Sequence, residues 1–333
     1  MNTFRRRAPQ VRPWAELAAR FSSSDLLLGN GFSISIWPAF NYSSLFDQFL
    51  ASCASADRTA FRALGSTNFE YVLETLGRAT AACRAFSLDP TRLVHGAVRA
   101  REGLIRAVEA THPRADELPR DRLTGISEAL DHFDDVYTTN YDCLLYHIVM
   151  ISKDRHEADR RIRPYNDYFW DRLDNDHLGF KNYQHYPQYK HIYYLHGALF
   201  LFRRSYADVK IRRTEGVELV EQVAIAIRQG EIPLFVSEGR PNEKKEAIYR
   251  SDYLRFAGDH LEKARDTLVV YGSSLSEPDR HVAAAIRNGT RRIAFALHRG
   301  ARSEIEVENE QLRVIQALGG VDVHFFWSNE LFQ

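Results

Sequence analysis

The chain has 333 residues, of which 44% are hydrophobic and 26% are charged, so it can bury a large core. A prior of about 150 residues per domain predicts two units, or one α/β domain that carries an insertion. Lys and Arg together number 44, and Asp and Glu also number 44. This balance argues against direct nucleic-acid binding, which usually goes with a cationic excess.

The cysteines give no sign of a disulfide framework or a zinc site, because Cys53, Cys83 and Cys143 are far apart and form no Cys-x-x-Cys pair. A reducing cytoplasm therefore fits best. No run approaches the ~18 apolar residues that a membrane span needs, and the N-terminus lacks the apolar region of a signal peptide. We expect a cytoplasmic protein that makes no membrane contact.

Short apolar runs alternate with helical patterns along the chain. Unbroken apolar runs that end in glycine or small polar residues are typical of strands buried on both faces of a parallel sheet. The expected strands are residues 25–29, 136–140, 191–197, 233–237, 267–272, 292–297 and 321–327. We predict an α/β fold with a Rossmann-like, doubly wound and mainly parallel sheet.

Helical periodicity marks residues 217–227, 243–265 and 304–318, which lie between the later strands. Residues 276–279 have the pattern of a capping box that begins a further helix. This regular succession of strands and helices supports the parallel sheet.

Two stretches interrupt the alternation of strands and helices. Residues 45–131 have almost only helical periodicity and are predicted to form a helical insertion. Residues 151–190 are rich in Tyr, Trp, Asp, Asn and His and are predicted to form an irregular, aromatic-rich loop. A loop of this length is typical of a lid or binding loop, with an aromatic-padded surface loop as the alternative. We expect residues 1–333 to be one catalytic domain that contains both.

Four of the expected strands end in residues suited to ligand binding, and ligands of open parallel sheets bind beyond the carboxyl ends of the strands. Glycines at such a position let backbone N–H groups approach a phosphate, although any tight β–α turn has the same need. Ile34 stands where a dinucleotide fingerprint has its third glycine, so the ordinary Rossmann pattern fails. The four strand ends are Gly29-Asn-Gly-Phe-Ser33, Thr139-Asn-Tyr-Asp142, His196-Gly197 and Gly272-Ser-Ser-Leu275.

The polar residues at two of these ends have both a functional and a structural interpretation. Thr139, Asn140 and Asp142 could grip a polar ligand or cap the next helix, and the two roles can coexist. His196 has the side chain best matched to general-base chemistry near neutral pH. A purely structural histidine is the alternative.

The ordered set of strand ends resembles the catalytic core of the sirtuins, which has a Gly-Ala-Gly-x-Ser loop, a Gln-Asn-x-Asp motif, a His-Gly pair and a Gly-Thr-Ser loop. The match is close at Asn140, Asp142, His196 and Gly197. More narrowly, the chain from about residue 25 resembles a bacterial family of unknown function in the sirtuin-like group. That likeness rests on Leu-Leu-Leu-Gly-Asn-Gly-Phe-Ser33, Tyr-Ser-Ser-Leu-Phe46, Tyr-Thr-Thr-Asn-Tyr-Asp142, Tyr-Tyr-Leu-His-Gly-Ala198, Pro-Leu-Phe-Val-Ser-Glu-Gly239 and Ser251-Asp-Tyr-Leu254.

The resemblance implies NAD as the substrate and a role for each strand end. Asn140 would hold the nicotinamide ribose and the attacking water, Asp142 would bind the carboxamide, and His196 would be the general base. The first loop would face the phosphates and the fourth loop the adenosine half. The other residues expected to bind NAD are Gly29, Asn30, Gly31, Ser33, Thr139, Gly272, Ser273 and Ser274.

Two departures from the sirtuin pattern change the expected reaction. Deacylase sirtuins usually carry a zinc ribbon with four cysteines, which this chain lacks. They also carry a Pro-Asp-Phe-Arg stretch where this chain has Trp37-Pro-Ala-Phe40. Without an acyl-lysine substrate, water is the natural acceptor. The expected reaction is therefore hydrolysis of NAD to nicotinamide and ADP-ribose without a metal.

Sirtuin-like proteins with this reduced pattern are often NAD-depleting effectors of bacterial anti-phage defence that stay silent until triggered. The resemblance implies a homo-oligomer or a partner protein such as an ATPase, with residues 45–131 as the regulatory contact or as a cap over the site. The alternatives are a sensor that binds NAD or ADP-ribose without turnover, a structural subunit of a defence complex, and an enzyme that deacylates or ADP-ribosylates a protein.

Several other polar residues are expected to be solvated. Lys244 and Lys245 have the pattern of an exposed face. His177, His185 and His191 match no compact metal-ligand spacing.

Overall fold

The structure is a computed structural model, and it describes residues 8–41, 45–53, 58–174, 176–182, 188–204, 207–212, 214, 216–236, 241–264, 266–289 and 292–332. The segments Tyr42-Ser-Ser44 and Ser237-Glu-Gly239, as well as His185, lie outside the described residues.

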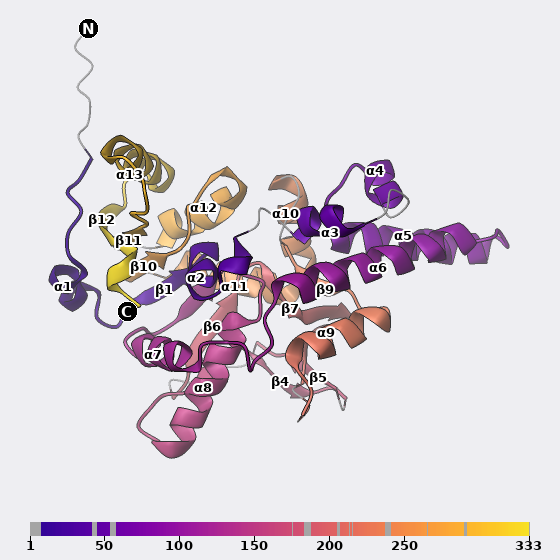
Figure 1. Cartoon of the computed structure of the whole chain (residues 1–333), viewed down its shortest axis with the longest axis horizontal. Coiled ribbons are helices and arrows are strands. Elements are labelled where there is room, and N and C mark those ends of the chain that lie inside the picture. The colour runs from indigo at the N-terminus through magenta and orange to yellow at the C-terminus, as the bar shows by residue number, and fades with distance from the viewer. Residues whose placement is uncertain are drawn as a thin grey trace, which may run out of the picture.

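Seven parallel strands form the larger of two sheets, in the order β12-β11-β10-β1-β2-β6-β3 (Figure 1). The prediction of an α/β fold with a mainly parallel sheet is therefore confirmed. The strands are β1 (Asp25–Leu28), β2 (Val136–Thr138), β3 (Tyr165–Asn166), β6 (Lys190–Tyr194), β10 (Thr267–Tyr271), β11 (Arg292–Leu297) and β12 (Asp322–Trp327).

The register of the central strands aligns their carboxyl ends. Leu28 pairs with Tyr271 on one side and with Thr138 on the other, and Thr138 in turn pairs with Tyr194. The chain therefore leaves β10, β1, β2 and β6 at the same edge of the sheet.

Helices cover both faces of the parallel sheet. Successive residues of β1 therefore belong to two different hydrophobic clusters, one on each face. Leu26 and Leu28 pack with α7 (Arg120–Leu130) and α8 (Leu144–Ala158). Leu27, between them, packs with α12 (Arg280–Gly289) and α13 (Glu304–Leu318). This burial on two faces explains why the strands are continuous apolar runs rather than alternating ones.

The second sheet is antiparallel, with the order β4-β5-β8-β7-β9. Residues 233–237 were expected to form a strand of the parallel sheet, which was wrong, because β9 pairs antiparallel with β7. Gly197 turns the chain directly from β6 of the parallel sheet into β7 of the second sheet, so a strand that pairs with β7 belongs to the second sheet. The strands are β4 (Phe169–Arg172), β5 (His177–Phe180), β7 (Gly197–Arg204), β8 (Ala207–Ile211) and β9 (Pro233–Phe235), and α9 (Leu219–Arg228) joins β8 to β9.

The segment 151–190 is more regular than predicted, because it contains the end of α8 and the strands β3, β4 and β5. Its aromatic residues pack against α11 (Asp252–Lys263) rather than padding a loop. The Phe169 and Phe180 rings lie 4.6 and 5.3 Å from the Tyr253 ring. Aromatic composition therefore marked residues of the hydrophobic core and not an irregular segment.

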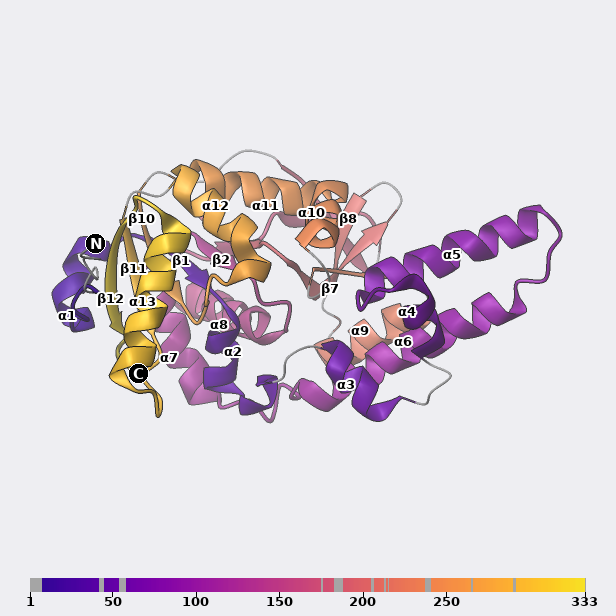
Figure 2. The ribbon, with the colours of Figure 1, turned by 90° about the horizontal axis from the view of Figure 1, so that it is seen from above.

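Residues 45–131 are helical wherever they are described in regular structure. A cluster of four phenylalanine rings, including Phe49 and Phe61 at 5.1 Å, holds the base of this block. Helices α5 and α6 form a long hairpin that projects from the molecule (Figure 2). The helices are α3 (Leu45–Ser52), α4 (Thr59–Leu64), α5 (Phe69–Ala85), α6 (Thr91–Thr111) and α7.

Two helix starts differ from the sequence prediction. Residues 243–265 form two helices, α10 (Pro241–Arg250) and α11, because Ser251 caps α11 by accepting from the Leu254 N–H. The capping box expected at residues 276–279 is absent, since Ser276 makes no side-chain cap there and residues 277–279 form a 3₁₀ turn before α12. Among the described residues, no helix combines the length and apolarity that crossing a bilayer requires.

Candidate functional site

The four polar strand ends meet at one place, because β10, β1, β2 and β6 are neighbours in the sheet. The strand order also reverses here. From β1 the chain first builds toward β2 and β6, and it later returns to build β10, β11 and β12 on the other side of β1. Such a switch point is where open α/β sheets bind their ligands.

The glycines of the first and fourth strand ends are required because the two loops touch. A Cβ on Gly29 would lie 2.6 Å from Ser273 Cα, and one on Gly31 would lie 2.8 Å from Gly272 Cα. The Gly31 N–H donates to the Gly272 carbonyl at 2.8 Å. The two loops are therefore packed directly against each other, and the Gly31 N–H already has a hydrogen-bond partner within the protein.

A hydrogen-bonded set joins the first strand end to the second. Ser33 Oγ donates to Asp142 Oδ2 at 2.5 Å, and Asn140 Nδ2 donates to Ser33 Oγ at 2.8 Å. Asn140 Nδ2 also donates to the Gly29 carbonyl at 3.0 Å. Both N–H groups of the amide are thus satisfied, which fixes the amide orientation.

Both carboxylate oxygens of Asp142 have partners within the protein, and one of them confirms the contact with the next helix that the sequence predicts. Its Oδ1 accepts from the Leu144 N–H at 2.8 Å and so caps α8, while Oδ2 accepts from Ser33. Burial raises the pKa of this carboxyl, and the Ser33 and Leu144 hydrogen bonds oppose the rise. A buried carboxylate held by neutral donors alone is a strong acceptor for a further donor.

The remaining predicted residues differ in how far they are exposed. Asn30 and Ser274 are exposed, and Thr139 is half-buried. Ser273 is buried and accepts from the Leu275 N–H at 3.3 Å. Leu275 has φ +46° although it is a bulky, buried residue, so this turn holds a backbone conformation that L-residues rarely adopt.

His196 lies at the carboxyl end of β6 and is buried. Its Nε2 lies 2.9 Å from Nε2 of His281, which is in the first turn of α12. Asp279 Oδ1 lies 4.0 Å from His196 Nε2 and 3.6 Å from Lys244 Nζ. Two imidazoles, a carboxylate and an ammonium group therefore form a second polar cluster at the site.

The surroundings of the two imidazoles keep both uncharged. Burial lowers the pKa of His196 well below its usual value, and the neighbouring His281 and Lys244 lower it further. Burial also lowers the pKa of His281 to about 4, against the opposing effect of Asp279. At neutral pH each ring is therefore neutral, with one N–H and one nitrogen lone pair.

A family model described as "Domain of unknown function (DUF4917)" matches residues 26–331. The chain belongs to this family. The match runs from β1 to beyond β12 and includes every residue of the site. A search of curated proteins gave no match.

Sequence reasoning missed three residues of the site: His281, Asp279 and Lys244. The expectation that Lys244 is solvated was wrong, because its side chain is buried beside Asp279. The one available signal was that Asp279 and His281 follow the fourth strand end within ten residues. Nothing in the spacing linked α10 to this position.

The histidines expected in solvated loops are also buried. His177 contacts Asp174 and His191 contacts Asp135, each through Nδ1 at 3.1 and 3.2 Å. Within the described part of the chain, no group of three or more His, Cys, Asp or Glu side chains is arranged to hold a metal ion.

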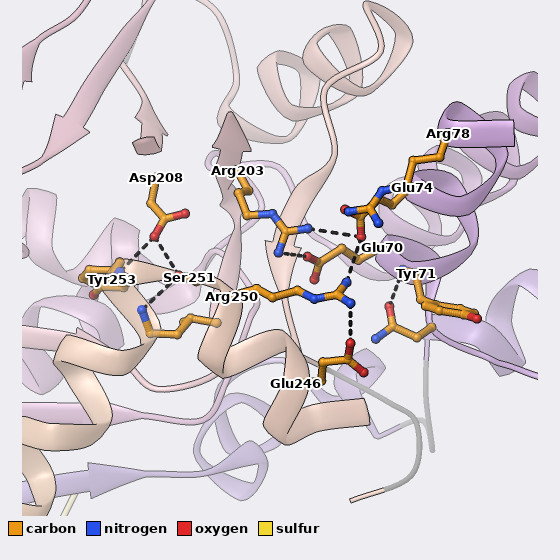
Figure 3. Close-up of polar contacts among 12 residues, drawn as sticks. Glu70, Tyr71, Glu74, Arg78, Arg203, Asp208, Glu246, Arg250, Ser251 and Tyr253 are labelled. Carbon is orange, nitrogen blue, oxygen red and sulfur yellow. Dashed lines mark hydrogen bonds and ion pairs between the residues drawn. The ribbon is translucent and has the colours of Figure 1, made fainter. Parts of the chain in front are cut away.

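A separate charged cluster lies between α5, β7 and α10 (Figure 3). Arg203 of β7 lies 3.0 Å from Glu70 Oε1 and 3.4 Å from Glu74 Oε2. Arg250 of α10 lies 3.2 Å from the same Glu74 oxygen and also pairs with Glu246. These residues, which we call the α5 cluster, include lining residues of a cavity of about 630 Å³.

Proposed function

We propose that the protein is a Rossmann-like, sirtuin-like NADase, which binds NAD at the four strand ends and hydrolyses it to nicotinamide and ADP-ribose. One observation carries the proposal. The bonded set of Ser33, Asn140 and Asp142 lies beside buried His196 at the switch point of a parallel sheet.

The chemistry asks for groups of these kinds. The bond between nicotinamide and ribose C1′ breaks with its electron pair going to the nicotinamide, which departs neutral. A water oxygen bonds to C1′, and its proton passes to His196. The developing oxocarbenium character calls for oriented dipoles and a carboxylate in a water-poor site. The Asn140 carbonyl oxygen would orient the ribose hydroxyls and the water, and Asp142 would accept from the carboxamide N–H.

The defence role is the part of the proposal that rests most on the sirtuin-like resemblance. We propose an effector that acts as a homo-oligomer or with a partner protein such as an ATPase. The α5–α6 hairpin supports a regulatory contact, because Phe86 and Leu88 at its tip are 78% and 60% exposed. Exposed large apolar side chains on a projecting element are typical of protein contacts.

A sensor that binds NAD or ADP-ribose without turnover is the second candidate. It is favoured by the strongly lowered pKa of His196, since a general base works best when its pKa is near the operating pH.

The test is to incubate the purified protein with NAD and to quantify nicotinamide and ADP-ribose. We expect release by the wild type and a loss of about 100-fold or more in His196→Ala and Asn140→Ala. His95→Ala, which changes an exposed histidine of α6, is the matched control and should keep full activity. Equal release by all four proteins would contradict the assigned site, and binding without release would favour the sensor.

A further inference from the structure

We infer that His281 is a positioning residue that holds His196 in a resting form, by donating a hydrogen bond to the ring nitrogen that must take the proton. The inference rests on the proposed function, because it concerns the base of that reaction. It also assigns a role to a residue that the strand-end motifs do not contain.

Both ring nitrogens of His196 have protein partners. Nε2 lies 2.9 Å from His281 Nε2, which leaves Nδ1 for the hydrogen bond to the Thr139 backbone. The Thr139 contact favours the protonated ring, so it is an N–H donated to the Thr139 carbonyl. A neutral imidazole has only one N–H, and in His196 it is therefore on Nδ1.

The tautomer of His281 follows from that of His196. With its N–H on Nδ1, His196 presents a lone pair at Nε2, and a 2.9 Å contact between two nitrogens requires one donor. His281 must supply that donor, so its own proton is on Nε2. The N–H of His281 thus stands where the O–H of an attacking water would have to stand.

Asp279 and Lys244 lie beside the histidine pair. His281 is in the first turn of α12, directly after the turn that carries Asp279. Asp279 is held by Lys244 of α10 at 3.6 Å and lies 4.0 Å from His196 Nε2. For His196 to act as a base, His281 must move away from Nε2, so the resting protein is restrained at the catalytic nitrogen.

The first test compares nicotinamide release by three proteins. His281→Leu keeps most of the side-chain volume but cannot donate, and we expect it to be about tenfold faster than wild type, the order expected for one buried hydrogen bond removed from the resting state. His281→Gln keeps an N–H donor and should stay near the wild-type rate. Release by His281→Leu at or below the wild-type rate would overturn the inference, as would equal acceleration by both variants.

The second test does not depend on catalysis or on the folding of a variant. Nitrogen-15 spectra of the wild-type histidines should show His196 protonated on Nδ1 and unprotonated on Nε2, and His281 protonated on Nε2. A proton on Nε2 of His196 would overturn the inference. If no protein releases nicotinamide but these tautomers are found, the NADase proposal fails while the contact between the two histidines stands.

Discussion

The strand-end site and the α5 cluster are both polar and partly buried, but they are held together by different forces. At the strand ends, neutral donors satisfy one carboxylate, and the two imidazoles carry no charge at neutral pH. In the α5 cluster, Arg203 and Arg250 share one oxygen of the Glu74 carboxylate, and Arg203 also faces Glu70. Directional hydrogen bonds hold the side chains of the strand-end site, whereas attraction between opposite charges holds those of the α5 cluster.

This difference indicates what each region can do. Hydrogen bonds and close backbone contacts fix atoms to within a few tenths of an ångström, which a reaction centre needs. Ion pairs tolerate shifts in geometry, so they can connect secondary-structure elements that move slightly relative to one another. The Arg203–Glu70 pair illustrates this, since the two groups are 3.0 Å apart without being aligned as a hydrogen bond.

Two elements run from one region to the other. Strand β7 begins at Gly197, next to His196, and carries Arg203 toward its far end. Helix α10 carries Lys244 at the site and Arg250 at the α5 cluster. A change in how the α5–α6 hairpin is held therefore has a physical route to the histidine pair.

The largest expected effect is at Gly197, where β7 begins next to His196. Its φ is +71°, and an added Cβ would lie 2.0 Å from the Leu234 carbonyl oxygen. We expect Gly197→Ala to lower the free energy of unfolding by about 4 kcal/mol or to prevent folding. Gly77→Ala in α5 meets no neighbouring atom and should instead gain about 0.5–1 kcal/mol. Chemical denaturation would show opposite shifts, and a stable Gly197→Ala would contradict the description of this turn.

We expect the second-largest loss in the free energy of unfolding when Arg203 is removed. The change Arg203→Ala leaves Glu70 buried without its closest cation, and we expect a loss of about 3 kcal/mol at pH 8. Arg250 is 40% exposed, so Arg250→Ala should cost about 1 kcal/mol or less. Equal losses in the two variants, measured by urea denaturation, would show that burial does not separate the members of the α5 cluster.

The third prediction concerns pH. Burial raises the pKa of Glu70 from 4.5 to about 7, although Arg203 opposes the rise. The folded protein therefore holds this proton more tightly than the unfolded chain. That stabilisation is complete below pH 4.5 and is lost as the pH rises through 7.

Glu70→Gln should remove this loss. Its free energy of unfolding, relative to wild type, should rise between pH 5 and pH 8 by about 2–3 kcal/mol. Glu308→Gln, on an exposed position of α13, is the matched control and should show no such trend. A difference in the free energy of unfolding between Glu70→Gln and wild type that stays constant from pH 5 to pH 8 would contradict this prediction. It would show that Glu70 is ionised throughout and that the α5 cluster is fully charged.

The parts of the fold that sequence predicted are those that depend on local pattern. The apolar runs located the parallel strands because both sheet faces are buried, and the polar strand ends located Ser33, Asn140, Asp142 and His196. The pattern could not reveal that β6 and β7 are different strands. The apolar run from His191 to Phe202 is nearly continuous, and only the conformation of Gly197 divides it.

Contacts between distant elements could not be predicted. His281 is 85 residues from His196 and Lys244 is on a helix with a hydrophilic sequence, so no periodicity connects them to the site. The α5 cluster was missed for the same reason, because Glu70, Arg203 and Arg250 meet only through the packing of three elements.

The most direct test of the strand-end site is calorimetric titration with ADP-ribose, which needs no turnover. We predict that wild type binds one equivalent, that Asn140→Ala weakens binding by about tenfold or more, and that Arg250→Ala in the α5 cluster leaves it unchanged. Binding that is lost in Arg250→Ala but kept in Asn140→Ala, or no binding by wild type, would contradict a nucleotide site at the strand ends.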